Sequence, residues 1–322
     1  MTRFYLIDAF TDKAFKGNPA AVVLCKSKDF TMHAELAKEF NLSETAFIDI
    51  DSACVSKEIE NNNTTTTFTS GTHFGLRWFT PTKEVKLCGH ATLAAAYVLF
   101  CKLDNLNKEI HFHTLSGILT VRRSLMDTSS DCTVLKLSFP LNPYIVLGTS
   151  VSSLSKPLQS LINCLISSTS QSTLSISHIQ EVFYSEKTGK LFIRLIDGEE
   201  SVHLLSLFTF PTSSILLNVD QTELEIDQKV TGISISVLAQ TENRDFMSRY
   251  TSPWNGIEED PVNGSSHTTL APYYAKELNR ETVIGEMASR RGGRIICNII
   301  KEEDKVELCG SCVLIGEGIL LI

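Results

Sequence analysis

Two matching segments, one in each half of the chain, constrain its fold more than any other feature. Residues 89–97 and 266–274 carry a histidine, a threonine, a leucine, an alanine and a tyrosine at the same spacing. Similarity between two parts of one chain is the signature of a repeated structural unit. We therefore expect two similar halves, each with a helix at this point.

Both segments also predict a place where an acid binds. Each expected helix begins at a turn of small residues, with Gly89 in the first copy and Gly264 in the second. The first backbone N–H groups of a helix have no partner inside the helix, and the helix dipole is positive there, so anions bind at such ends. Two such turns predict a clamp for a small acid.

Length and charge exclude several classes of function. The 322 residues favour two domains, and the hydrophobic fraction of 43% and charged fraction of 20% are typical of globular proteins. The net charge of -8, with no basic run, argues against a nucleic-acid partner. No apolar run approaches the roughly 20 residues of a membrane helix, and Asp8 comes too early for a signal peptide. We expect a cytoplasmic protein with a small-molecule ligand and no membrane partner.

The nine cysteines predict neither a disulfide framework nor a metal site. They form an odd set scattered through apolar segments, as expected of reduced, buried thiols. The one CxxC pattern joins Cys309 and Cys312, and no second ligand pair at similar spacing accompanies it. We expect no bound metal.

The order of predicted elements is α+β in both halves, each mixing a sheet with one long helix. The first domain is expected over residues 1–124, with a solvated or disordered Asn/Thr-rich insert at about 56–73 and the last C-terminal strand as a candidate additional strand. The second domain is expected over residues 125–322. The predicted strands lie near 4–10, 20–24, 44–50, 76–80, 109–114, 117–123, 133–139, 179–184, 190–196, 214–218, 232–239 and 245–250, with helices from Thr31, over 89–101 and over 264–278 and further strands through 320.

Glu44 is the first candidate for chemistry. It lies at a predicted helix-to-strand junction between Leu42 and the apolar pair Ala46 and Phe47. Partial burial there would favour the protonated carboxyl and suit it to proton transfer. The local sequence alone favours the alternative, a solvated acid at a strand edge.

The second candidate is Asp260, which precedes the turn of Gly264 and Ser265. A solvated acid that complements the helix dipole is the alternative, but the duplicated turn favours a ligand clamp. His90 and His267 can each donate to an anion or relay a proton near neutral pH. A packed histidine is the alternative for His90, and packing is expected for His267, which lies one turn further into its helix.

Cys88 supports a different mechanism, a racemase that uses two thiols. A helix start lowers the pKa of a thiol, but a second cysteine is needed at the matching turn. That position holds Asn263 or Ser265, depending on a two-residue ambiguity in the alignment of the copies. The chain also lacks the G-x-S-x-G, G-x-G-x-x-G and P-loop motifs, so we expect no cofactor.

Several long motifs, in order over nearly the whole chain, resemble those of the PhzF family of phenazine-biosynthesis-like isomerases, and most closely its animal branch, the phenazine biosynthesis-like domain-containing proteins. The motifs are Asp8-Ala9-Phe10, Phe15-Lys16-Gly17-Asn18-Pro19, Leu42-Ser43-Glu44-Thr45-Ala46-Phe47, Leu76-Arg77-Trp78-Phe79-Thr80-Pro81, Leu87-Cys88-Gly89-His90-Ala91-Thr92, Asp245-Phe246, Ser248-Arg249-Tyr250, Glu259-Asp260-Pro261-Val262, Gly264-Ser265 and Arg290-Arg291-Gly292-Gly293.

The resemblance implies a diaminopimelate-epimerase-like fold. Such a fold has two similar α+β domains, each a curled, mostly antiparallel sheet around a central helix, with the active site in the cleft between them. It implies that Glu44 moves a proton without a cofactor and that His90, Asp260 and Ser265 hold and polarise the substrate. It also implies that the turns at Gly89 and Gly264 bind the substrate carboxylate, and that the protein forms a homodimer.

The departures from the family pattern concern the substrate. Asn263 replaces the usual threonine, and residues 124–230 match weakly. We therefore expect a cofactor-independent isomerase or epimerase that acts on a small carboxylate, with Glu44 as general acid and base. The alternative is a non-catalytic binding or interaction protein that retains the isomerase fold.

Overall fold

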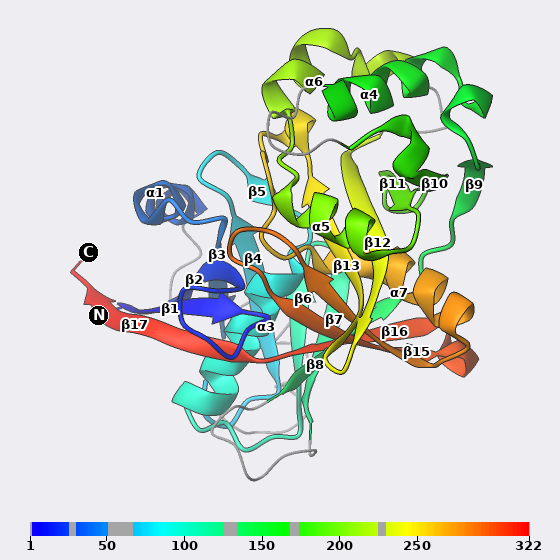
Figure 1. Ribbon diagram of the computed structural model, residues 1–322. Coiled ribbons are helices and arrows are strands. Elements are labelled where there is room, and N and C mark those ends of the chain that lie inside the picture. The colour runs from blue at the N-terminus through cyan, green and yellow to red at the C-terminus, as the bar shows by residue number, and fades with distance from the viewer. Residues whose placement is uncertain are drawn as a thin grey trace. The chain divides into compact units, whose positions relative to one another are not determined.

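The chain forms two compact units in the computed structural model, which describes residues 2–25, 30–50, 67–124, 134–167, 174–224 and 230–321. One unit contains Met1–Ser138 with Glu307–Ile322, and the other contains Phe139–Val306. The strands of each unit are shown in Figure 1, coloured by position along the chain. None of the helices in these ranges is long and apolar enough to cross a membrane.

The first unit is built on a mostly antiparallel sheet. Its strands are β1 (Thr2–Ala9), β2 (Asn18–Cys25), β3 (Glu44–Asp49), β4 (His73–Phe79), β5 (Glu84–Val85), β6 (Glu109–Thr114), β7 (Gly117–Arg123), β8 (Leu135–Pro140) and β17 (Cys312–Leu320). Neighbouring strands are antiparallel except for the parallel pairs β2–β3 and β4–β6. The last strand, β17, pairs along the whole of β1.

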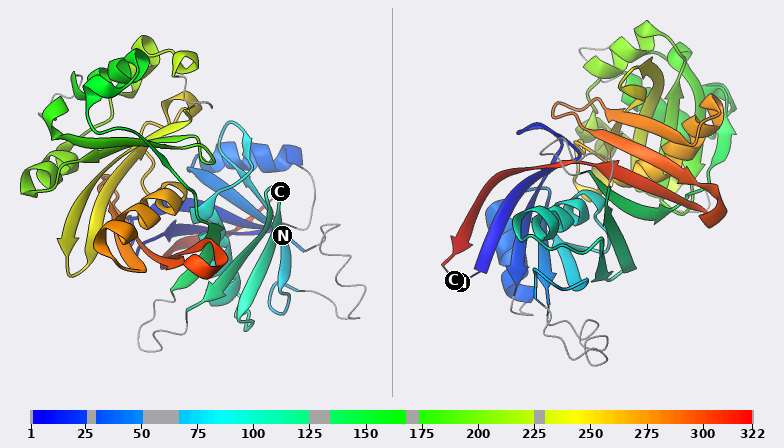
Figure 2. Two further views of the ribbon diagram at one scale, coloured as in Figure 1. Left: turned by 90° about the vertical axis from the view of Figure 1, so that its right-hand side faces the viewer. Right: turned by 90° about the horizontal axis from the view of Figure 1, so that it is seen from below.

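Helix α3 (Gly89–Tyr97) is the central helix of this unit. It packs against β1, β2, β3 and β17 (Figure 2), and every residue from His90 to Ala96 is buried. A helix that is buried all round must be apolar on all faces, and its alanines let the strands approach closely. The π-helical turn Val98–Lys102 continues the helix, and α1 (Phe30–Phe40) packs against β3 and β4.

The described residues of the second unit form strands of mixed direction and four α-helices. Its strands are β9 (Ile145–Gly148), β10 (Ile179–Ser185), β11 (Lys190–Leu195), β12 (Gly232–Thr241), β13 (Arg244–Thr251), β14 (Thr282–Met287) and β15 (Arg294–Ile300). Strand β16 (Lys305–Gly310) crosses the boundary between the units, which lies after Val306. Its helices are α4 (Lys156–Ser167), α5 (Glu199–Leu207), α6 (Thr212–Asn218) and α7 (Gly264–Leu278). Short 3₁₀ turns lie at Val151–Ser153, Ile176–His178, Gln221–Glu223, Pro253–Asn255 and Lys301–Glu303.

The two faces of this sheet carry different side chains. Leu191 and Ile193 of β11 enter an apolar core that also contains residues of α4, α5 and α6. The alternate residue Arg194 lies on the other face, with its guanidinium 5.1 Å from the ring of Tyr274 in α7. Side chains alternate across a strand, and Lys190 is four residues before Arg194 on the same strand. Lys190 therefore lies on the same face of the sheet as Arg194.

The order of strand pairing repeats between the units. In the first, β1–β2 is antiparallel, β2–β3 parallel, β3–β4 antiparallel, β4–β6 parallel and β6–β7 antiparallel. In the second, β10–β11, β11–β12, β12–β13, β13–β14 and β14–β15 follow the same order. The central helices α3 and α7 occupy the same place in this order, before β6 and β14 respectively. The matching segments thus mark equivalent helices of two topologically similar units.

Three expectations from the sequence need correction. The predicted strand at 214–218 is helix α6, because a short apolar run does not distinguish strand from helix and here only one side, with Ile215, is buried. The predicted domain boundary at 124 lies before β8, which belongs to the first unit because it pairs with β7. The second unit has four described helices rather than one.

One further prediction falls largely outside the described residues, and one helix was not predicted. For the Asn/Thr-rich insert expected at about 56–73, residues 56–66 lie outside the described residues, and β4 begins at His73. The helix over residues 156–167 was not predicted, although Leu158, Leu161, Ile162 and Leu165 recur at helical spacing and are buried. This spacing is the signal by which α4 could have been found.

The contact between α7 and β14 leaves no room for a side chain at Gly285. A Cβ atom there would lie 2.4 Å from His267 Nε2 and 2.6 Å from Phe246 Cζ. We expect Gly285→Ala to lower the free energy of unfolding by about 1–3 kcal/mol because overpacking forces these rings to shift, as measured by urea denaturation. Gly316→Ala in β17 is the control, since its nearest neighbour would be Leu6 Cδ1 at 3.9 Å. Equal stability of the two variants would contradict the packing described.

Candidate functional site

A chain of hydrogen bonds in the first unit ends on Glu44. The Ser43 hydroxyl donates to Asn18 Oδ1 at 3.2 Å, and Asn18 Nδ2 lies 3.1 Å from His90 Nδ1. His90 Nε2 lies 3.1 Å from Glu44 Oε2. Glu44 is the first residue of β3, His90 is the second of α3, and Asn18 is the first of β2. The packing of α3 over β2 and β3 brings these residues together.

This chain of contacts assigns the histidine protons. In a neutral ring, an amide N–H of Asn18 that donates to Nδ1 leaves the proton on Nε2, which then donates to Glu44 Oε2. A rotated Asn18 amide would accept from Nδ1–H instead, and the Ser43 hydroxyl can serve either orientation because it both donates and accepts. The network therefore accommodates a neutral or a charged His90 with Nε2 protonated in both.

Burial and charge act in opposite directions on His90. Burial lowers its pKa, but the interactions of the ring with Cys88 and Glu44 together outweigh burial and raise the pKa well above its ordinary value. Burial raises the pKa of the Cys88 thiol, and the negative charge of Glu44 raises it further. The thiol is therefore neutral near pH 7, and Glu44 supplies the negative charge that stabilises a protonated His90. The Glu44 side chain is 15% exposed, which leaves its carboxylate within reach of a small ligand.

The structure also shows how the two helix starts correspond. Both helices begin at glycine, Gly89 and Gly264, with Cys88 and Asn263 as the preceding N-cap residues. By this alignment Ser265 takes the position of His90, and Asn263 takes that of Cys88. The racemase alternative therefore lacks its second thiol, and its first is a buried, neutral one.

Each helix start presents free backbone donors. Among the described residues, the N–H groups of Gly89 and His90 in α3, and of Gly264 and Ser265 in α7, have no hydrogen-bond partner. Unpaired N–H groups at the positive end of a helix form an anion-binding site. Both turns that the sequence singled out have the donors required for a carboxylate.

Asn263 organises the start of α7. Its side-chain oxygen accepts from the backbone N–H of Ser266 at 2.7 Å and from the hydroxyl of Ser265 at 3.1 Å. Its amide Nδ2 donates to Asp260 Oδ2 at 2.8 Å. Asn263 therefore caps the helix and connects Asp260 with Ser265.

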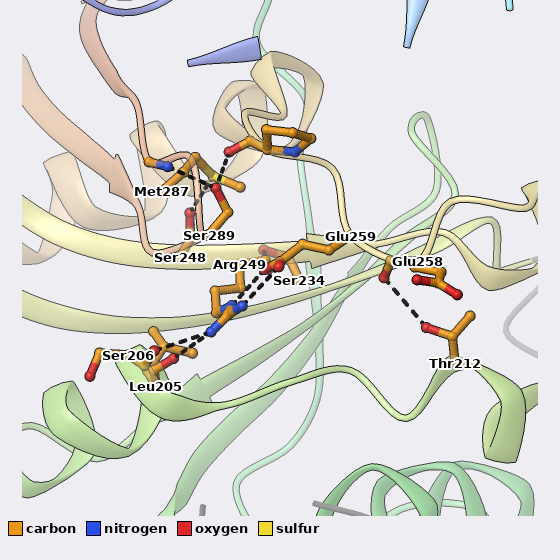
Figure 3. A network of polar contacts seen from close by, with 12 residues as sticks. Leu205, Ser206, Thr212, Ser234, Ser248, Arg249, Glu258, Glu259, Met287 and Ser289 are labelled. Atoms are coloured by element: carbon orange, nitrogen blue, oxygen red, sulfur yellow. Dashed lines mark hydrogen bonds and ion pairs between the residues drawn. The ribbon is translucent and has the colours of Figure 1, made fainter. Parts of the chain in front are cut away.

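An ion pair anchors the loop that carries Asp260. Arg249 of β13 donates from Nε and Nη2 to the carboxylate of Glu259 at 2.6 and 2.8 Å, and from Nη1 to the carbonyls of Leu205 and Ser206 at 3.3 Å (Figure 3). Arg249 is 5% exposed, and a bidentate pair of this kind fixes geometry well. Asp260 follows directly, and its N–H donates to the Tyr250 carbonyl at 3.0 Å.

His267 lies in the interior of the second unit. It is the fourth residue of α7, it is fully buried, and its Nδ1 lies 2.8 Å from the carbonyl of Asn263. Its ring centroid is 5.5 Å from that of Phe246. Burial lowers the pKa of His267 to about 4, so the ring is neutral and packs as an apolar group.

Glu44, Cys88 and His90 form the one group of described His, Cys, Asp and Glu side chains whose ligand atoms are close enough for a metal, all within 4.8 Å. Metal binding would require His90 Nε2 to release Glu44 and Cys88 to lose a proton that burial retains. In the described part of the chain all cysteines are free, Cys101 and Cys164 are half-buried and the others are buried. Cys54 and Cys132 lie outside the described residues.

Four side chains that support the site are not identified by the sequence pattern. Asn18, Ser43, Arg249 and Glu259 contact Glu44 or Asp260 only indirectly, through His90, Asn263 or the backbone. Their partners are distant in sequence, so no local spacing identifies them. The turn of Gly17, Asn18 and Pro19 carried a signal, since Asn18 is a fully buried polar residue directly after a glycine.

Comparison with known proteins gives consistent matches over the full length. The family model described as PhzC-PhzF, phenazine biosynthesis-like protein, matches residues 7–318. A phenazine biosynthesis-like domain-containing protein from Bos taurus is 38% identical, covering 98% of both chains. A protein named as an uncharacterized isomerase, from Halalkalibacterium halodurans, is 34% identical, covering 100% of this chain and 99% of its own.

Solved structures of similar proteins share the fold. A PhzC/PhzF protein from Clostridium difficile has a TM-score of 0.73 at 30% identity, with 100% of both chains covered. A PhzF family protein from Enterococcus faecalis has a TM-score of 0.75 at 28% identity, covering 100% of this chain and 99% of the other. A predicted epimerase from Pseudomonas aeruginosa has a TM-score of 0.65 at 16% identity, with both chains fully covered, and shares the fold. The α+β fold predicted from the sequence is confirmed.

The buried neutral His267 should make stability depend on pH. Its pKa is about 4 in the folded protein and 6.5 in the unfolded chain, so the unfolded chain binds more protons between these values. Stability is therefore complete above pH 6.5 and falls as the pH decreases to 4, by about 3 kcal/mol from this group. Urea denaturation at pH 7 and pH 4 should show that His267→Gln loses less stability than the unmodified protein. An equal loss in both would contradict a neutral, buried ring.

Proposed function

Because the chain belongs to the PhzC-PhzF family of phenazine biosynthesis-like proteins, we propose that it is a cofactor-independent isomerase or epimerase that moves a proton on a small carboxylic acid. The observation that supports this most is the hydrogen-bonded series from Ser43 through Asn18 and His90 to Glu44. It ends on a carboxylate that is 15% exposed, beside a helix start with free N–H donors. The relative named as an isomerase supports the same class of reaction.

Glu44 is the proposed general base. The bond from His90 Nε2–H occupies Oε2, which leaves Oε1 to accept a proton from a carbon near the acid group of the substrate. The tethered imidazole fixes the direction of the carboxylate, and correct placement is a large part of proton-transfer catalysis. The protonated Glu44 then returns the proton to the same or another carbon, so the reaction needs no oxidant or reductant.

The helix starts are the proposed sites for negative charge. Loss of a proton next to a carboxylate produces an enolate-like anion, and donors that are fixed in place stabilise it more than the neutral ground state. The N–H groups of Gly89 and His90 serve this role in the first unit, and those of Gly264 and Ser265 in the second. Asp260, held by Asn263, is proposed to hold and polarise the substrate with the Ser265 hydroxyl.

Glu44→Gln tests the proposed base directly. The amide keeps the size of the side chain but cannot accept a proton from carbon. The rate at which the acid exchanges a carbon-bound hydrogen with solvent should therefore fall by at least about 10²-fold. The measurement is deuterium incorporation from heavy water into a set of small carboxylic acids, followed by NMR. Thermal unfolding of the variant should match that of the unmodified protein.

Cys88→Ala is the matched control because Cys88 contacts the same histidine at 3.5 Å. A glutamate mechanism predicts that this variant retains exchange, whereas a thiol racemase would be inactive. Exchange that persists in Glu44→Gln would overturn the proposed base. Binding of an acid without exchange in the unmodified protein would favour a non-catalytic binding protein that retains the fold.

A further inference from the structure

Lys190 distinguishes the second unit from the first at equivalent positions. In the first unit, Ala20 of β2 lies opposite Glu44, the first residue of β3, in a parallel register. In the second unit, β11 and β12 are also parallel, and Lys190 of β11 lies opposite Gly232, the first residue of β12. The repeated topology therefore places a lysine and a glycine in one unit where the other has an alanine and the carboxylate Glu44.

The glycine at this position is required by Tyr250. A Cβ atom on Gly232 would lie 2.0 Å from the Tyr250 hydroxyl and 2.5 Å from its Cζ. The tyrosine ring fills the space of a side chain at 232, and Lys190 Nζ lies 5.6 Å from the centroid of that ring. Burial, then the charge of Asp260, raises the pKa of Tyr250, so its hydroxyl is neutral.

The ammonium of Lys190 has no hydrogen bond or ion pair to any residue of the described ranges, although the side chain is only 7% exposed. A buried charge without such a partner is unfavourable unless a ligand supplies one. The charge of Asp260 acts on both Lys190 and Tyr250. The backbone N–H of Asp260 donates to the carbonyl of Tyr250, whose ring lies beside the ammonium, and the side chain of Asp260 accepts from the N-cap Asn263. Tyr250 and Asp260 thus connect Lys190 with the start of α7.

This series of contacts connects three kinds of donor. They are the Lys190 ammonium, the unpaired N–H groups of Gly264 and Ser265, and the hydroxyl of Ser265, which now donates to Asn263. The charged group facing Lys190 among the described residues is Asp260, whose Oδ2 accepts from Asn263. In the first unit, Ala20 occupies the position equivalent to Lys190.

We propose that Lys190 binds a carboxylate oxygen of the substrate, together with the N–H groups at the start of α7. This inference rests on the proposed function, because it assigns the first unit to proton transfer and the second to charge neutralisation. The charge-assisted bond from an ammonium is stronger than one from a backbone N–H. Lys190 thereby selects anionic over neutral forms of the same acid.

Lys190→Met tests the assignment with malonate as the anionic probe and malonamide as its neutral counterpart, by calorimetric titration. Malonate affinity should fall at least tenfold, malonamide binding should not change, and the melting temperature should stay equal or rise because an unpaired buried charge is removed. Lys187→Met is the matched control, since Lys187 is exposed in the turn before β11. It should bind malonate as the unmodified protein does.

The unmodified protein provides a second test that needs no variant. Burial lowers the pKa of Lys190 to about 8, against a smaller opposite effect of Asp260. The amine is charged below that value, so malonate affinity should fall as the pH rises through 8, and this dependence should be absent in Lys190→Met. Unchanged malonate affinity in Lys190→Met, or the same pH dependence in both proteins, would overturn the inference.

The outcomes separate this inference from the proposed function. Loss of exchange in Glu44→Gln with unchanged malonate binding in Lys190→Met would retain the base and reject the lysine contact. Weakened malonate binding in Lys190→Met with normal exchange in Glu44→Gln would retain the lysine contact and reject the base. A lower melting temperature with normal malonate affinity in Lys190→Met would show a structural role alone.

Discussion

The hydrogen bond from His90 to Glu44 is the contact on which the account of this protein depends. It joins the start of the central helix α3 to the start of β3, and it exists because an Ala-rich helix can approach the sheet closely. Asn18 holds the opposite side of the imidazole. A carboxylate that would otherwise be a solvated strand-edge acid thus has a fixed direction, and a fixed direction is what a general base requires.

The second unit repeats the topology of the first but has different chemistry at equivalent positions. The pairing of β2 with β3 contributes Ala20 and Glu44, and the pairing of β11 with β12 contributes Lys190 and Gly232. The helix starts keep their unpaired N–H groups in both. The repeated topology therefore keeps the two turns that we propose to bind anions, while the side chains beside them differ in charge. In this proposal one unit supplies the base and the other supplies the cation.

Much of this arrangement could be predicted from the sequence, because its signals are local. The helices at 89–101 and 264–278 follow from small-residue turns and matching spacing, and Glu44 lies at the predicted helix-to-strand junction between α1 and β3. Asn18 and Lys190 could not be found this way, since their roles arise from β pairing and from partners that are distant in the sequence. The sequence match pairs His90 with His267, but the structure does not. The two helices begin at Gly89 and Gly264, so Ser265 occupies the position that corresponds to His90.

The most direct test of the central contact is the protonation state of the two His90 nitrogens, measured by NMR of protein labelled with ¹⁵N-histidine across a pH range. The account predicts a proton on Nε2 in both the neutral and the charged ring, with Nδ1 bare in the neutral form. Substitution of Glu44 by glutamine should change the Nε2–H signal of His90. A neutral His90 with its proton on Nδ1 and a bare Nε2 would contradict the account, because that tautomer cannot donate to Glu44.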